Sequence, residues 1–209
     1  MALFSDIKTF FDLKNRLCGF VILCIFSSFS LNAAPILILG DSLSASYGMP
    51  ENEGWVQLLR AKMPEHTLIN GSVSGETSAG GLRRLPALLE STQPKVLLVE
   101  LGGNDGLRGF PPKQLKTNLS NIIKLAKDQQ VTILLSEIMV PPNYGPRYAA
   151  QIANVYKELA QEHNITLMPF FMETIVIDST LMQRDGIHPN AAAQPQIADF
   201  MLPWFLQAL

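Results

Sequence analysis

Short apolar runs alternate along the chain with longer segments whose apolar residues recur at helical spacing. The runs are nearly continuous in hydrophobicity, as in strands covered on both faces, and lie at residues 36–39, 67–69, 95–101, 131–138 and 165–170. The amphipathic segments predict helices over residues 55–63, 78–90, 112–129, 147–163 and 190–209. Ser78 and Asn190 are the expected N-caps of two of these helices. This alternation predicts an α/β fold with a parallel sheet and right-handed crossovers.

The polar and glycine-rich loops of the chain all follow predicted strands. They comprise residues 40–46, 70–77, 102–109, 140–148 and, after an irregular connection, 185–190. In a parallel sheet, the loops after the carboxyl ends of the strands form the ligand crevice. We therefore expect these loops to converge on one site.

The first 33 residues have the pattern of a cleaved signal peptide. Three basic residues open it, namely Lys8, Lys14 and Arg16. An apolar stretch at residues 17–31 follows and is short for a bilayer span. We expect cleavage after Ala33, because cleavage one residue later would leave Pro35 at the new N-terminus. An uncleaved membrane anchor remains the alternative.

Both cysteines of the chain, Cys18 and Cys24, lie inside this predicted signal peptide. A lipoprotein signal does not fit, because Leu23 precedes Cys24 where a small residue is needed. The mature chain has no thiol chemistry and can enter an oxidising compartment, so the protein is expected to be periplasmic or secreted.

Residues 34–209 are predicted to form a single domain. This part carries 13 basic and 16 acidic side chains, a net charge of −3, without runs of like charge. The charge pattern argues against a nucleic-acid partner and against an anionic membrane surface. We expect a monomer that does not insert stably into a membrane after cleavage.

Residues 40–44 (GDSLS) follow the first apolar run directly. A serine at the tip of a buried strand, in a turn that opens a helix, is exposed and has backbone donors beside it. Ser42 is therefore a candidate nucleophile. Gly-Asp-Ser is also ordinary turn chemistry, so this motif alone does not decide the function.

Residues 185–190 (DGIHPN) supply a candidate base and its orienting group. Asp185 stands three residues before His188, where its carboxylate can accept from Nδ1 and leave Nε2 free to take the serine proton. The two other histidines, His66 and His163, are expected to lie at helix-to-strand junctions with no polar company. Asp185 can alternatively serve as a turn former or a helix cap.

Three groups can supply donors for an oxyanion. They are the backbone N–H of Ser42, the backbone N–H of Gly75 and the side-chain amide of Asn104. Preorganised donors of this kind stabilise an acyl-transfer transition state by roughly 3–4 kcal/mol each. A turn glycine at Gly75 and a loop cap at Asn104 are the alternatives.

Together these motifs resemble the SGNH (GDSL-type) hydrolases, and most of all the bacterial exported thioesterase I, lysophospholipase and arylesterase group. The resemblance extends over almost the whole mature chain and includes RLPALL, VELGGNDGLRG, PPNYGPRY and MPFFMET. It implies a flavodoxin-like three-layer α/β/α sandwich with a five-stranded sheet in the order 2-1-3-4-5. It also implies Ser42 as nucleophile, Asp185 and His188 as the acid–base pair, and Ser42, Gly75 and Asn104 as the oxyanion hole.

The resemblance implies a serine esterase or thioesterase that needs no metal or organic cofactor. The chain differs at residues 139–142 (MVPP), where close relatives have an Arg-Leu-Pro-Ala-like segment. An apolar wall suited to an alkyl chain is expected from Met139, Val140, Pro141, Pro142, Tyr144 and Ile187. The small-molecule substrate is thus expected to be an acyl ester or thioester, such as a lysophospholipid, an aryl ester or an acyl thioester.

Other functions remain open at this point. A carbohydrate O-deacetylase on the same fold would have an open groove lined by polar and aromatic residues. A flavin site is disfavoured because Asp41 puts an anionic group where a phosphate would bind. A metal hydrolase is disfavoured because three scattered histidines form no cluster at ligand spacing. A binding module without turnover would keep the same motifs.

Overall fold

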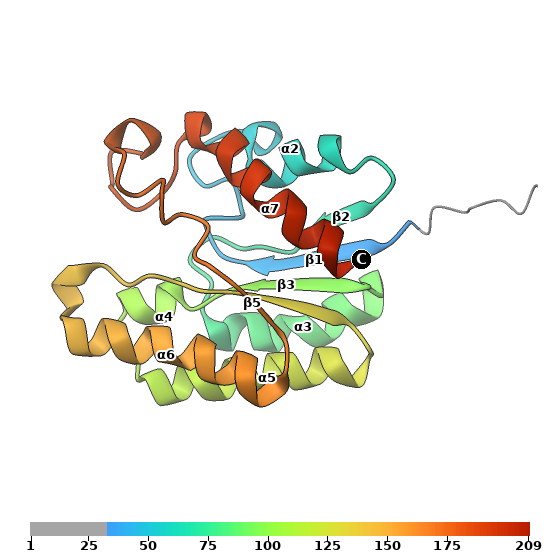
Figure 1. Ribbon diagram of the computed structural model, residues 1–209, viewed down its shortest axis with the longest axis horizontal. Coiled ribbons are helices and arrows are strands. Elements are labelled where there is room, and N and C mark those ends of the chain that lie inside the picture. The colour runs from blue at the N-terminus through green and yellow to red at the C-terminus, as the bar shows by residue number, and fades with distance from the viewer. Residues whose placement is uncertain (1–32) are drawn as a thin grey trace, which may run out of the picture. The chain divides into compact units, whose positions relative to one another are not determined.

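Five parallel strands form one sheet in the order β2-β1-β3-β4-β5 in the computed structural model, which describes residues 33–209 (Figure 1). The strands are β1 Pro35–Gly40, β2 Thr67–Asn70, β3 Val96–Glu100, β4 Thr132–Ser136 and β5 Thr166–Met168. Both the predicted strands and the predicted order 2-1-3-4-5 are confirmed. The predicted signal peptide lies outside the described residues except for Ala33.

Helices cover both faces of the sheet, as the three-layer prediction requires (Figure 1). Helices α2 (Trp55–Lys62) and α7 (Gln194–Ala208) pack together on one face. Helices α3 (Ser78–Thr92), α5 (Pro112–Asp128) and α6 (Pro146–His163) form the layer on the other face. Within the described residues, no helix is both long and apolar enough to span a membrane.

Short elements in the connecting loops complete the fold. They are α4 Gly103–Leu107, η1 Glu51–Glu53, η2 Pro142–Tyr144, η3 Ser179–Leu181 and η4 Ala191–Ala193.

The two core layers follow from the two-residue period of the strands. Along β1, Ile36 and Ile38 pack in the layer with α2 and α7, whereas Leu37 and Leu39 pack in the layer with α3, α5 and α6. All four side chains are fully buried. A continuous apolar run is therefore required in this strand, because both of its faces are covered by helices.

Strand β1 marks the point at which the direction of the sheet order changes. The chain passes from β1 to β2 on one side and then crosses to β3 on the other side of β1. The connections that leave the carboxyl ends of β1 and β3 therefore run in opposite directions, and in open parallel sheets ligands bind at such a point. This placement brings the GDSLS segment together with the loops after β2 and β3.

Two of the predicted helix starts were wrong. No helix opens at Ser42: residues 42–48 form consecutive turns, in which Ser46 and Gly48 have positive φ, and α2 begins only at Trp55. Thr77 rather than Ser78 caps α3, because the Thr77 hydroxyl accepts from Gly80 N at 3.2 Å. The predicted cap Asn190 is confirmed, since its side chain accepts from Ala192 N.

Strand β3 ends in a fully buried carboxyl group, that of Glu100. The parallel register pairs Glu100 with Gly40, and a Cβ at Gly40 would come within 2.6 Å of Glu100 Oε2, so any larger residue there would displace the buried carboxyl group. Glu100 Oε2 accepts from Ser44 Oγ at 2.7 Å and from Asp41 N at 3.2 Å. Burial raises the pKa of Glu100 well above its ordinary value, and the charge of Asp41 raises this pKa further.

We expect replacement of Glu100 by glutamine to flatten the pH dependence of stability. A carboxyl group with a raised native-state pKa favours folding fully below its unfolded pKa, near 4.5. This contribution is lost as the pH rises towards the pKa of Glu100 in the folded protein, because in this range folding requires the carboxyl group to take up a proton. Between about pH 5 and 9 the thermal midpoint should therefore fall less in Glu100→Gln than in the wild type.

The matched control is Glu90→Gln, which changes an exposed glutamate on α3. Its curve of thermal midpoint against pH should run parallel to that of the wild type. If Glu100→Gln also ran parallel to the wild type, Glu100 would be ionised in the folded protein at neutral pH.

Candidate active site

The nucleophile candidate Ser42 lies in the turn that directly follows β1. The carbonyl of Asp41 accepts from Ala45 N at 3.0 Å and from Ser44 N at 3.3 Å, which closes the turn around Ser42. Ser44 is anchored from below, because its hydroxyl donates to the buried Glu100. Ser42 itself is half-buried, and its hydroxyl contacts His188.

His188 and Asp185 meet Ser42 in the geometry of an acid–base relay. His188 Nε2 lies 2.8 Å from Ser42 Oγ, and His188 Nδ1 lies 2.7 Å from Asp185 Oδ2. A carboxylate can only accept, so Nδ1 carries the hydrogen, and Nε2 of a neutral ring is free to accept from the serine hydroxyl. The sequence therefore identified three side chains that the fold brings together.

The loop that carries His188 is fixed by its own hydrogen bonds. Asp185 Oδ1 accepts from Ile187 N at 2.9 Å and from His188 N at 3.0 Å, which makes a tight turn around Gly186. Gln183 N donates to His188 O at 2.8 Å. Asp185 thus shapes the backbone of the loop with one oxygen and orients the imidazole with the other.

Asp185 is ionised over the whole pH range in which a neutral histidine can act as a base. Partial burial acts to raise its pKa, but the hydrogen bonds from His188 N, from the His188 ring and from Ile187 N outweigh burial and lower the pKa to about 2. A negative charge beside Nδ1 favours a positively charged imidazole, which forms when the serine proton is taken up.

Tyr47 is a neighbour of the base that the sequence analysis missed. Its ring lies 4.3 Å from the His188 ring, centroid to centroid, with an angle of 36° between the planes. Gln183 Nε2 donates to Tyr47 O at 2.7 Å and to Pro189 O at 3.0 Å, so it links the nucleophile loop to the base loop. No spacing in the sequence indicates these contacts, because Tyr47 and Gln183 are 136 residues apart.

The predicted oxyanion donors lie in loops that are bonded to the residues preceding Ser42. Val73 N, in the loop after β2, donates to Gly40 O at 3.1 Å, and Asn104 Nδ2, in the short helix α4, donates to Asp41 Oδ2 at 3.0 Å. Among the described residues, neither Ser42 N nor Gly75 N donates to a backbone or side-chain acceptor. The backbone donors Ser42 N and Gly75 N are thus available to a ligand.

The Gly75 turn is held in an unusual conformation by a neighbouring arginine. Gly75 has φ +77°, which favours glycine, and its carbonyl accepts from Arg108 Nη2 at 3.0 Å. Arg108 follows α4, so this bond fixes the Gly75 loop relative to the loop that carries Asn104.

The residues predicted to form an acyl wall differ in their exposure. Met139, Tyr144 and Ile187 are exposed, whereas Pro141 is half-buried. Val140 is buried in the core and packs beside Gly106, so it connects the predicted wall to helix α4. Tyr144 Oη donates to Leu107 O at 2.7 Å, which attaches the wall to α4. The backbone of Pro142 begins the short helix η2.

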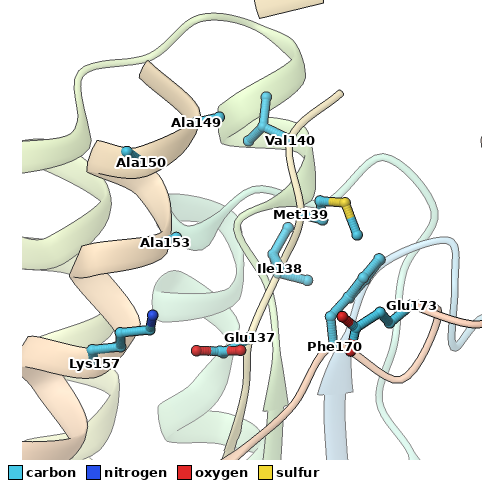
Figure 2. A pocket seen from close by; sticks show the side chains of 10 residues that line it. All are labelled: Glu137, Ile138, Met139, Val140, Ala149, Ala150, Ala153, Lys157, Phe170 and Glu173. Carbon is cyan, nitrogen blue, oxygen red and sulfur yellow. The ribbon is translucent and has the colours of Figure 1, made fainter. Parts of the chain in front are cut away.

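A cavity of about 320 Å³ lies beside this wall, between the end of β4 and helix α6 (Figure 2). Ile138, Met139 and Val140 line one side of it, and the small side chains of helix α6 leave the space open on the other. Charged groups at its edge come from Glu137, Lys157 and Glu173. Ile138 also packs near Gly103, which precedes Asn104, so the cavity lies close to the oxyanion loop.

The two other histidines have polar partners, contrary to expectation. His66 Nδ1 accepts from Ala34 N at 3.3 Å, and His163 Nε2 lies 2.9 Å from Ser120 Oγ on α5. Neither contact lies in the loops at the carboxyl ends of the strands. In the part of the chain that the structure describes, no group of three or more His, Cys, Asp or Glu side chains is placed to hold a metal ion.

Relatives with known names share most of the chain. An arylesterase of Vibrio mimicus is 46% identical over 190 residues, which cover 89% of this chain and 95% of the relative. Thioesterase 1/protease 1/lysophospholipase L1 of Escherichia coli K12 is 50% identical over 170 residues, covering 81% of this chain and 82% of the relative.

Solved structures agree with these relatives. The psychrotrophic esterase EstA from Pseudoalteromonas sp., in a structure inhibited by monoethylphosphonate, is 48% identical. The match covers 83% of this chain and 97% of that protein, with a TM-score of 0.81. The model of the GDSL-like Lipase/Acylhydrolase family matches residues 38–194, a span that begins in β1 and includes Ser42, Asp185 and His188. The chain therefore belongs to the GDSL-like lipase/acylhydrolase family.

Proposed function

We propose that this protein is a serine esterase that hydrolyses acyl esters through a covalent acyl-serine intermediate. The observation that carries the proposal is the chain of contacts from Ser42 Oγ through His188 to Asp185, at 2.8 and 2.7 Å. Among the described residues the backbone N–H of Ser42 itself has no acceptor, so it is free to bind an oxyanion. Similarity to an arylesterase, an esterase and a thioesterase/lysophospholipase supports the same reaction class.

In the proposed acylation, Ser42 Oγ attacks the carbonyl carbon of the ester while its proton passes to His188 Nε2. The carbonyl oxygen becomes an oxyanion, which the N–H groups of Ser42 and Gly75 and the amide of Asn104 would stabilise. The intermediate then collapses, the bond to the leaving oxygen or sulfur breaks, and His188 returns the proton to the leaving group.

Deacylation repeats these steps with water as the nucleophile. His188 takes a proton from the water, whose oxygen forms a bond to the acyl carbon, and Ser42 leaves with the proton that His188 returns. The products are a carboxylic acid and the free enzyme. Asp185 keeps the imidazole oriented and stabilises its transient positive charge, which its low pKa allows at any pH where the base functions.

The proposed substrates have an apolar acyl part and a leaving group that extends into solvent. Exposed Met139 and Tyr144, together with the apolar side chains that line one side of the adjoining cavity, form an apolar surface near the oxyanion loop. Lysophospholipids, aryl esters and acyl thioesters all present the same carbonyl to Ser42. The catalytic groups come from one chain, which supports a monomer as the active unit.

We also propose that the protein is exported to the periplasm or the medium. The basic start, the apolar stretch at residues 17–31 and the small residues at Asn32, Ala33 and Ala34 support a cleaved signal peptide. An exported enzyme meets lysophospholipids and external esters rather than the cytoplasmic acyl-CoA pool, so these esters are the proposed physiological substrates.

Replacing Ser42 by alanine should abolish nearly all turnover. Without the nucleophile, kcat for a 4-nitrophenyl ester should fall on the order of 10⁴-fold or more, because only binding and the oxyanion donors remain. The matched control Ser91→Ala alters an exposed serine at the end of α3 and should keep the wild-type rate. Retention of near wild-type kcat/KM in Ser42→Ala, with unchanged thermal unfolding, would refute the assignment of the nucleophile.

The acyl preference should favour chains longer than acetate. In a series of 4-nitrophenyl esters, kcat/KM should climb with each methylene that enters the apolar surface, by up to ~0.8 kcal/mol per group, until the site is full. A maximum at acetate, with release of acetate from an acetylated sugar, would instead indicate a carbohydrate O-deacetylase.

A substitution in the cavity tests whether the acyl chain of the substrate lies there. Ala153→Leu fills space between α6 and Ile138 and should move the optimum to shorter esters while leaving the acetate ester little affected. Gln151→Leu adds the same side chain at an exposed position of α6 and serves as the control. An unchanged optimum in Ala153→Leu would place the acyl chain outside this cavity.

A further inference from the structure

Two buried carboxyl groups lie directly beneath the nucleophile turn, and the acyl-transfer steps above use neither. Asp41 is 3% exposed and Glu100 is fully buried. Glu100 Oε2 accepts from the backbone N–H of Asp41, so the two residues are in direct contact. Buried carboxyl groups are costly unless they are neutral or fully hydrogen-bonded, so such a pair requires an explanation.

The Asp41 side chain accepts two hydrogen bonds. Oδ1 accepts from Leu43 N at 3.1 Å, and Oδ2 accepts from Asn104 Nδ2 at 3.0 Å. The first bond shapes the turn that carries Ser42. The second fixes the side chain of Asn104, the only oxyanion donor candidate that could rotate.

The bond to Asp41 determines which end of the Asn104 amide faces the site. If the amide turned over, its oxygen would meet the Asp41 carboxylate, and two acceptors would oppose each other. One Nδ2 hydrogen is bonded to Asp41. Because the amide is planar, this bond also fixes the direction of the second Nδ2 hydrogen, which remains available to an oxyanion. A donor that is oriented before the substrate arrives needs no reorganisation when the oxyanion forms.

Glu100 is placed to keep the negative charge on Asp41. Its Oε1 has no hydrogen-bond partner among the described residues, an arrangement that suits a protonated acid better than a carboxylate. Burial raises the pKa of Asp41 to about 6 and raises that of Glu100 well beyond its usual range. The charge of Asp41 raises the pKa of Glu100 further, whereas the hydrogen bonds from Leu43 N and Asn104 Nδ2 act to lower the pKa of Asp41, so Glu100 is the member of the pair that keeps a proton.

We propose that Asp41 and Glu100 form a carboxyl pair that shares one proton, and that the Asp41 carboxylate is the positioning residue for the oxyanion donor Asn104. The inference rests on the proposed acyl-serine mechanism. Asp41 acts through Asn104 and does not touch the reacting atoms. Glu100 acts through Asp41 and through Ser44, whose hydroxyl it holds at 2.7 Å.

A double-mutant cycle separates positioning from general support of the fold. Asp41→Asn keeps the size of the side chain but leaves one acceptor oxygen for two donors, Leu43 N and Asn104 Nδ2. We expect Asp41→Asn and Asn104→Ala each to lower kcat for a 4-nitrophenyl ester roughly 10- to 100-fold, with a smaller effect on KM. In the double variant, kcat should be about the same as in the slower of the two single variants, because both changes remove the same donor.

If the two losses multiplied in the double variant, or if Asp41→Asn kept the wild-type kcat, the positioning role would be refuted. Asp128→Asn, at the end of α5 and away from the site, is the matched control and should match the wild type. Failure of the mechanism itself would be seen separately, as turnover that survives in Ser42→Ala.

Two measurements on the folded wild-type enzyme test the pair even if Asp41→Asn does not fold. One side-chain amide hydrogen of Asn104, identified by its loss in Asn104→Ala, should exchange with solvent more slowly than those of exposed Asn52. Infrared spectra at neutral pH should contain the carbonyl band of a protonated carboxylic acid that disappears in Glu100→Gln and persists in Glu90→Gln. Equal exchange of the two asparagines would overturn the positioning role, and absence of the band would overturn the shared proton.

Discussion

The contact between Ser42 Oγ and His188 Nε2 joins two residues that are 146 positions apart, and the catalytic proposal depends on it. Neither residue is reactive alone: a free serine hydroxyl is a weak nucleophile, and a histidine becomes a base only when a proton lies within reach. The 2.8 Å separation requires the turn after β1 and the loop before α7 to meet with an accuracy of a few tenths of an ångström. Much of the fold around the site can be understood as the means of achieving this.

Strand β1 provides the fixed side of that contact. It is paired on both edges and buried on both faces, so the turn at its carboxyl end cannot shift without moving the core. The loop with His188 is fixed by Asp185, by Gln183 and by the bridge between Met182 and Pro189. The oxyanion loops are tied to the same turn through Gly40 and Asp41, so the donors and the nucleophile share one reference point.

The parallel sheet and the positions of Ser42, Asp185 and His188 could be predicted from the sequence, because apolar runs and short motifs are local signals. The strand order came only from the resemblance to a known family, since no local signal specifies it. The contacts of Glu100 could not be predicted. In the run KVLLVEL it is a lone acidic residue, and only the pairing of β3 with β1 places it beneath Asp41. Tyr47 and Gln183 were missed for the same reason, since their contacts depend on how two loops meet. The helix expected at Ser42 was wrong because residues with positive φ interrupt that segment.

Mass spectrometry of the enzyme during turnover shows whether Ser42 carries the acyl group. Protein quenched in acid while it hydrolyses a 4-nitrophenyl ester should contain a fraction with the mass of one added acyl group. After digestion, this mass should be found on the peptide that contains Ser42, and a fluorophosphonate probe should label the same peptide. A modification at another residue, or burst release of 4-nitrophenol with no modified protein, would contradict the account.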